Sequence, residues 1–210
     1  MKEEQMNYNG KNRKLKAKAT REKIYKSAEK LFSQNDYNKV SVDAIVEAAG
    51  VAKGSFYVHF ASKDALIAML INDHVEKADT DYKAFLDTFH EDASAETIIL
   101  SLIGTISDEL IDKIGCGKMK AVYKAQIAKD VDTGAVMGYN RALYKMFSDV
   151  LERGIRKGEF KSGLSPDLLA RHFMLAIRGI TYEWCIRYPE FDLKTQAVEH
   201  FEILINGLKG

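Results

Sequence analysis

Apolar and polar residues alternate along the chain with the spacing of helices. In most segments the apolar residues recur at steps of three and four, which places them on one face of a helix. This spacing predicts helices at about residues 20–34, 42–49, 52–58, 62–89, 94–114, 118–128, 133–157, 166–188 and 193–207. The period-two alternation of half-buried strands is seen in no segment. The sequence therefore predicts an all-α fold.

Two short predicted helices lie close together between residues 41 and 60, in the stretch SVDAIVEAAGVAKGSFYVHF. Ser41 is expected to cap the first helix, because its hydroxyl can accept a hydrogen bond from a free backbone N–H. Gly50 follows the last apolar residue of that helix, where a left-handed turn is common. Two helices joined by a tight turn form a helix-turn-helix motif, whose second helix can enter the major groove of DNA.

The second helix of this motif has a polar outer face. Lys53 and Tyr57 are four residues apart and so project from the same side, with Gly54 and Ser55 beside them. Such a face suits phosphates and base edges better than it suits apolar packing. The pattern alone leaves an alternative open, in which a helical hairpin merely exposes these side chains to water.

The run from Thr20 to Leu70, with its core KGSFYVHFASKDAL, resembles the N-terminal domain of TetR-family transcriptional regulators. The resemblance is carried by the aromatic-x-His-Phe segment and by the Ser-Lys-Asp-x-Leu opening of the next helix. Val58 departs from the pattern, because many members have a second aromatic residue there. The resemblance implies that Lys53 and Tyr57 meet base edges or adjacent phosphates. The remaining residues of the implied DNA-binding surface are Thr20, Ser41, Gly54, Ser55, His59 and Lys63.

Charge is unevenly distributed along the chain. Residues 1–63 contain 13 Lys and Arg against 7 Asp and Glu, whereas the rest of the chain is net acidic by five charges. A basic end on an acidic body is typical of a phosphate-binding domain joined to one that does not bind phosphate. We expect a flexible basic arm at 1–18, a DNA-binding domain at 19–65 and a helical ligand-binding and dimerisation domain at 66–210. The arm is either a solvated tail or an extra contact to DNA.

By the same resemblance, the middle helices form an effector pocket and the last two helices form a dimer interface. Aromatic rings and flexible sulfur atoms suit a hydrophobic or aromatic ligand. For Arg178, contact with an anionic ligand group and an internal salt bridge both remain open. The predicted pocket residues are Tyr123, Phe147, Met174, Arg178 and Tyr182. The predicted interface residues are Phe173, Ile180, Trp184, Val198, Phe201 and Ile205, for which the alternative is the core of a single chain.

Other classes of function find little support in the sequence. The histidines lack metal-ligand spacing, and no nucleophile is paired with a base, so we expect neither an enzyme nor a cofactor. No apolar run reaches the ~20 residues of a membrane span, and the polar N-terminus does not resemble a signal peptide. Cys116 and Cys185 form no CxxC pair, which favours the reducing cytoplasm.

The resemblance implies a homodimeric repressor that binds a palindromic operator and is released by a small molecule. Two-fold symmetry would place two recognition helices in successive major grooves. An alternative from another class is a helical dimer that binds DNA or a protein architecturally, without any small effector. A ligand that releases DNA would separate these hypotheses.

Overall fold

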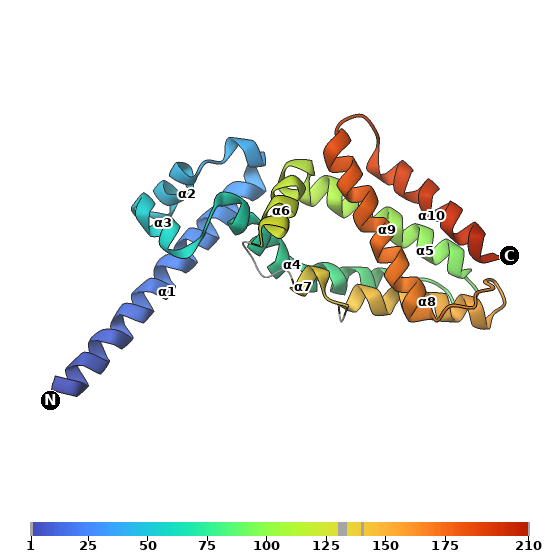
Figure 1. Ribbon diagram of the computed structural model, residues 1–210, viewed down its shortest axis with the longest axis horizontal. Helices are drawn as coiled ribbons and strands as arrows, with labels where there is room; N and C mark the ends of the chain where they lie inside the picture. Colours follow the sequence, from blue (N-terminus) through green and yellow to red (C-terminus); the bar gives the residue numbers. More distant parts are fainter. Residues whose placement is uncertain (1, 130–133, 140, 210) are drawn as a thin grey trace.

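The computed structural model describes residues 2–129, 134–139 and 141–209, without the side chains of residues 2–12, 76 and 135. Over these ranges the chain is helical with connecting turns and has no strand, so the predicted all-α fold is confirmed (Figure 1). The elements are α1 (Lys2–Gln34), η1 (Tyr37–Lys39), α2 (Val42–Ala49), α3 (Lys53–His59), α4 (Lys63–Leu86), α5 (Ala95–Asp108), η2 (Glu109–Ile114), α6 (Cys116–Ala128), α7 (Gly134–Met137), α8 (Ala142–Arg156), α9 (Pro166–Arg187) and α10 (Leu193–Lys209).

Local capping signals set several helix boundaries. The hydroxyls of Ser41, Ser62 and Ser165 each accept a hydrogen bond from the backbone N–H three residues later, at 3.0, 2.9 and 3.3 Å. These bonds satisfy donors that the first turn of a helix leaves free. Gly50 ends α2 with φ +65°, in the left-handed region that glycine adopts at least cost. The predicted starts of α2, α4 and α9 are thus confirmed.

The N-terminal segment differs from the prediction. Helix α1 begins at Lys2, so the backbone of the expected flexible arm is helical and Thr20 lies inside the helix instead of at its predicted start. In Figure 1 this part of α1 extends away from α2 and α3. Lys is the commonest residue of this segment, and Lys, like the Glu, Arg and Met residues beside it, favours helix even where no apolar face exists. Apolar periodicity detects a buried face, and the described side chains of this segment, at residues 13–19, are all exposed.

Three further boundaries also differ. Helix α4 ends at Leu86 instead of continuing to Phe89, and the helix expected at 133–157 is divided into α7 and α8. Gly134 and Gly138 lie near this division, and glycine lowers helix propensity. After α5 the chain continues as the π-helix η2, a geometry that occurs mostly in short stretches and often beside functional sites.

Two hydrophobic cores are connected by α4. The head core is formed by α1, α2, α3 and the first turns of α4, which contribute Leu66 and Leu70. The larger body core lies among α4, α5, α8, α9 and α10. Helix α4 therefore crosses the predicted domain boundary at 65–66, and its 24 residues span about 36 Å. Among the described helices, none has the length and apolar character needed to cross a membrane.

Candidate DNA-binding surface and internal cavity

The orientation of α3 is fixed by the aromatic residues on its inner side. Phe56 is fully buried and Phe60 nearly so, and their rings lie 5.6 Å apart between centroids. Tyr57 follows Phe56 and must point the other way, because successive helical residues are about 100° apart. Its ring is 54% exposed and touches the Phe56 ring edge-on at 5.3 Å. Burial of one side of α3 therefore presents the other side to solvent.

The predicted recognition residues share this outer side. Lys53, Gly54 and Tyr57 are exposed, while Ser55 and His59 are half-buried at its margins. A Cβ atom added at Gly54 would meet nothing within 4 Å, so the surface there is open. Val58, where the family pattern often has an aromatic residue, is 78% exposed. The structure thus brings together the α3 part of the predicted site.

A carboxylate that the sequence reasoning missed lies on this surface. The Nζ of Lys53 is 2.9 Å from an oxygen of Asp43, in the first turn of α2. This hydrogen bond, with the charge of Asp43, raises the pKa of Lys53. Both side chains are more than half exposed, and exposed ion pairs are weak, so a phosphate can displace Asp43.

Lys63 is placed differently from the prediction. Its Nζ donates hydrogen bonds to the backbone oxygens of Tyr37 and Val40, at 3.0 and 2.9 Å, and lies 4.0 Å from the centre of the Tyr37 ring. Burial lowers the pKa of this lysine. Two of its three N–H groups are therefore engaged inside the protein, where they hold η1 against α4, and only one remains for DNA.

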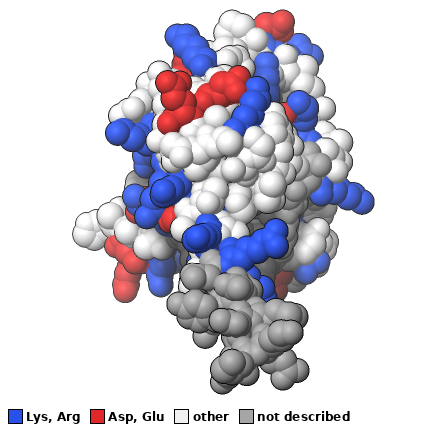
Figure 2. Space-filling model, turned by 90° about the vertical axis from the view of Figure 1, so that its left-hand side faces the viewer, with Lys and Arg blue, Asp and Glu red and all other residues white. Residues whose placement is uncertain are grey.

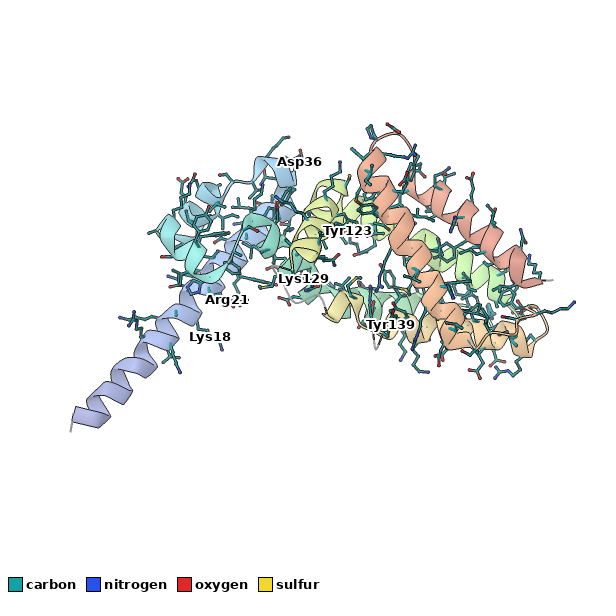
Figure 3. All side chains as sticks on the ribbon, in the orientation of Figure 1. Lys18, Arg21, Asp36, Tyr123, Lys129 and Tyr139 are labelled. Carbon is teal, nitrogen blue, oxygen red and sulfur yellow. The ribbon has the colours of Figure 1, made fainter. Side chains whose placement is uncertain are left out.

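Helix α1 adds basic side chains to the same end of the molecule. Lys14, Lys18 and Arg21 follow at helical spacing, and all three are exposed. Figure 2 views this end and shows Lys and Arg side chains distributed around an uncharged centre, with Asp and Glu gathered mostly to one side. Lys18 and Arg21 follow one another along α1 in Figure 3. Arg21 also packs over the Phe60 ring, at 5.3 Å, next to α3. The sequence analysis did not place these residues on one surface, because it expected residues 1–18 to be a flexible arm and not part of a helix.

A cavity of about 410 Å³ lies between the head and the body. Its wall is built from α4, η2, α6, α9 and the segment around α7, and it reaches the end of α1. Tyr123, Met174 and Arg178 of the predicted pocket lie in this wall. Phe147 does not, because it is fully buried in the body core against Phe173. Tyr182 does not either, because it is 45% exposed on the outside of α9. The structure therefore brings three of the five predicted pocket residues together in this wall and leaves the other two outside it.

The charged residues of the cavity wall are mostly paired. Arg141 forms hydrogen bonds of 2.6–3.1 Å with both oxygens of Asp79, and both side chains are almost completely buried. Glu109 pairs with Lys113 at 2.6 Å. Within the described ranges Arg178 has no carboxylate partner, so the internal salt bridge considered for it is not formed there.

Helix α6 connects the cavity wall to the head. Met119 and Val122 line the cavity, while Lys124 of the same helix lies 2.5 Å from Asp64 in the first turn of α4. Asp64 also accepts a hydrogen bond from the Tyr37 hydroxyl. Burial alone would raise the pKa of Asp64, but the hydrogen bonds from Lys124 and Tyr37 outweigh it and hold that pKa below its usual range. The same contact with Asp64, together with burial, raises the pKa of Tyr37.

The predicted dimer residues lie mainly inside the chain. Phe173, Trp184, Phe201 and Ile205 are at most 4% exposed, while Ile180 and Val198 are half-buried against the same core. The structure places the first four in the core of a single chain, the alternative considered for them, because the inner sides of α9 and α10 pack within the chain. The outer side of the two helices instead exposes the large apolar residues Leu168, Leu175, Tyr182, Ile186 and Ile203.

Comparison with known proteins agrees with the head described above. Residues 24–70 match the family model described as "Bacterial regulatory proteins, tetR family". The chain is 23% identical over 200 residues to the transcriptional regulator UidR of Escherichia coli, covering 94% of this chain and 96% of that protein. It is 26% identical to the transcriptional regulator AcrR of Shigella flexneri, covering 91% and 90%.

Solved structures share the fold over almost the whole chain. A TetR-family transcriptional regulator from Pectobacterium atrosepticum aligns with a TM-score of 0.65 at 18% identity, covering 92% of this chain and 96% of that one. The regulator FadR from Bacillus subtilis, solved in complex with stearoyl-CoA, aligns with a TM-score of 0.53 at 19% identity, covering 89% and 98%.

The helix-turn-helix head and these matches together define a class of protein. The chain belongs to the TetR family of transcriptional regulators, and it is a DNA-binding regulator and not an enzyme. The described residues contain no group of three or more His, Cys, Asp or Glu side chains that could hold a metal ion.

Proposed function

We propose that the chain is a homodimeric repressor, which binds a palindromic operator through α3 and leaves it when a small molecule fills the cavity beside α4. The observation that supports this most is the position of the cavity. Its wall includes α4 and α6, the two helices that also contact the head. A ligand there acts on the same elements that hold the recognition helix.

Sequence reading is assigned to the outer side of α3. Lys53 and Tyr57 are proposed to contact base edges or adjacent phosphates, with Gly54 allowing close approach. Ser41, Ser55 and His59 are proposed to contact the phosphate backbone, supported by the basic side of α1. Thr20 is half-buried in α1 and Lys63 is largely engaged with η1, so both are assigned minor roles.

Dimerisation is assigned to the outer side of α9 and α10. Leu168, Leu175 and Ile186 follow α9 on one side, and each is between 39% and 59% exposed. Gly179 lies on the exposed part of the same helix, where an added Cβ atom would meet nothing within 4 Å. Contiguous exposed apolar surface of this kind marks an interface. A two-fold pair places two copies of α3 on the two half-sites of a palindrome, in the cytoplasm where the operator is found.

Release is assigned to a change in the balance of two conformations. A ligand shifts such a balance only by the difference in its affinity for the two forms. We propose that the ligand-bound form moves α6, and that the contact between Lys124 and Asp64 transmits this movement to α4. The apolar residues of the wall suit a hydrophobic or aromatic effector.

The experiment begins with selection of bound sequences from random duplex DNA, followed by titration of the selected site. The expected result is a palindromic site that binds one dimer, with far weaker binding to either half-site alone. Screening small molecules for release of this DNA tests the effector. If no molecule that fills the cavity changes operator affinity, the architectural dimer without an effector is the better description.

The dimer is tested by light scattering on the intact chain and two variants. Leu175→Glu places a charge on the proposed interface and is expected to yield monomers with weak operator binding. Ile127→Glu is the matched control, because Ile127 is 75% exposed on α6, away from that surface. A monomeric mass for the unmodified chain at micromolar concentration would contradict the proposal.

A further inference from the structure

We propose that the cavity binds an amphipathic anion, whose apolar body contacts the helices of the wall and whose acidic head group is held by Arg178. This inference rests on the proposed function, because it names the chemical class of the effector. It depends on three observations. Arg178 has no carboxylate partner in the described ranges, the nearby hydroxyl of Tyr144 has no hydrogen-bond partner there, and the other arginine of the wall is already paired.

Arg178 lies near the middle of α9 and is half-buried in the cavity wall. One of its terminal nitrogens donates a hydrogen bond to the backbone oxygen of Val136, at 3.1 Å. A guanidinium has five N–H groups and stays protonated in proteins, so most of its donors remain available. Within the described ranges no carboxylate lies within ion-pair distance of it. A half-buried charge without a counter-charge is costly, and an anionic ligand would relieve that cost.

Tyr144 of α8 lies beside this guanidinium. The centre of its ring is 5.7 Å from the guanidinium carbon, and the residue is only 6% exposed. In the part of the chain that the structure describes, its hydroxyl is the buried side-chain polar atom left without a hydrogen-bond partner. Buried polar groups in native proteins are almost always paired, so such an atom points to a missing partner. Tyr144 does not itself line the cavity, and we place the oxygens of a head group bound to Arg178 on the side of the guanidinium that adjoins this hydroxyl.

The other charges of the wall do not supply that partner. Arg141 directs its Nε and one terminal nitrogen at the two oxygens of Asp79, so its charge is already matched, whereas Arg178 has no such partner in the described ranges. Lys118 is a second cation of the wall, and its Nζ reaches only the backbone oxygen of Lys113, at 3.4 Å. Burial lowers the pKa of Lys118, and the carboxylate of Asp81 in the same wall is solvent-exposed. Among the described residues, Arg178 and Lys118 are therefore half-buried cations of the wall for which no carboxylate partner is found.

Apolar side chains make up much of the remaining wall. They include Ile67, Leu70, Ile106, Leu110, Met119 and Met174. A volume of about 410 Å³ is within the range of small-molecule sites. A fully polar anion would leave these side chains in contact with water or with its charge, whereas an apolar body covers them. The wall thus selects a molecule with one acidic end and one apolar end.

The test uses three probes with the same alkyl chain, namely decanoate, monodecyl phosphate and 1-decanol, measured by isothermal titration calorimetry on the intact protein. We expect at least one of the two acids to bind about tenfold or more tightly than the alcohol. Preference for decanoate or for the phosphate distinguishes a carboxylate head group from a phosphate one. If neither acid binds, or if the alcohol binds as tightly as both acids, the proposal is overturned.

Variants locate the head group. Arg178→Gln is expected to lower affinity for the acids by about tenfold, with affinity for 1-decanol unchanged. Arg178→Lys keeps the positive charge but cannot form the paired hydrogen bonds of a planar guanidinium. Its affinity for the acids is therefore expected to lie between those of the unmodified protein and Arg178→Gln. Tyr144→Phe is expected to lower affinity for the acids relative to 1-decanol by a smaller factor than Arg178→Gln does. The matched control is Arg171→Gln on the same helix, because Arg171 also lies over a tyrosine ring but is exposed and outside the wall.

Folding of each variant is checked by its circular dichroism and by operator binding without ligand. If Arg178→Gln folds and still prefers acids, the head group lies elsewhere and the proposal fails. An operator-release assay separates this inference from the proposed function. Acids that bind through Arg178 without releasing DNA would overturn the proposed release mechanism alone. A neutral or cationic molecule that releases DNA from the cavity would overturn the present inference alone.

Discussion

The head and the body of this regulator are packed in different ways. The head core is continuous, with Ile24, Ile45 and Phe56 fully buried and the starts of α2 and α4 capped by serine side chains. The body borders the cavity and contains a π-helix, a buried ion pair and, among the described residues, a buried tyrosine hydroxyl for which no partner is found. A rigid head keeps the geometry of DNA recognition constant, while an imperfectly packed body can change shape when a ligand binds.

The largest difference between the head and the body is expected in the free energy of unfolding that is lost when a large side chain is replaced by alanine. Phe56→Ala in the head should cost about 3–5 kcal/mol, because neighbouring side chains cannot fill the space that the ring leaves. Leu110→Ala in the cavity wall should cost less than about 2 kcal/mol, because that side chain is only half-buried and already borders empty space. Urea unfolding followed by circular dichroism measures both. Equal losses would remove the distinction between the two cores.

The buried pair Asp79–Arg141 tests whether the body depends on polar contacts. Asp79→Asn should destabilise the protein by about 3 kcal/mol, because it leaves the buried guanidinium without a counter-charge. The double variant Asp79→Leu with Arg141→Met should recover much of that loss. Thermal unfolding of the single and double variants measures both effects. A single variant as stable as the unmodified chain would show that the pair contributes little to the body.

Tyr57→Ala tests whether the head surface acts in recognition and not in folding. The substitution should weaken operator binding by about 1–3 kcal/mol and leave stability unchanged, because the ring is more than half exposed. Tyr139→Ala is a matched control, since Tyr139 is 62% exposed and far from α3 along the chain. Fluorescence anisotropy with labelled operator measures the difference. Unchanged affinity would remove Tyr57 from the proposed site.

The link between the two regions should depend on pH. Asp64 has a lowered pKa in the folded protein, so its stabilisation is complete above the ordinary aspartate value of about 3.9 and is lost as pH falls through the folded value. Asp64→Asn should therefore cost about 1 kcal/mol between pH 5 and 7, and the cost should shrink as pH falls below about 4 and disappear only below the lowered pKa of the folded state. Urea unfolding across this range checks the sign. A cost that persists at low pH would indicate a structural role unrelated to charge.

The smallest effect is expected for the surface pair on the head. Asp43→Asn frees Lys53 and removes a negative charge from the DNA-binding surface, so operator affinity should rise slightly at low salt. The plot of log affinity against log salt should become steeper by about 0.9, the value for one added phosphate contact. Anisotropy titrations at several salt concentrations measure this slope. An unchanged slope would mean that Lys53 contacts no phosphate, and the same substitution should leave ligand binding in the body unaltered.

The sequence by itself determined the elements whose causes are local. Ser41, Ser62 and Gly50 act within a few residues of their own position, so the head and its motif could be predicted, as could the all-α class. The exposed side of α3 followed from the same helical spacing.

Only the tertiary structure decided which face of a helix meets which neighbour. Phe173 and Phe201 had the pattern of an interface, yet α5 and α8 cover them, and the spacing of apolar residues does not specify the partner. The helical backbone of residues 2–18 gave no periodic apolar signal, since this part of α1 extends away from the other helices in Figure 1. The pairing of Asp79 with Arg141, which leaves Arg178 open to the cavity, joins residues more than sixty positions apart and depends on the packing of three helices.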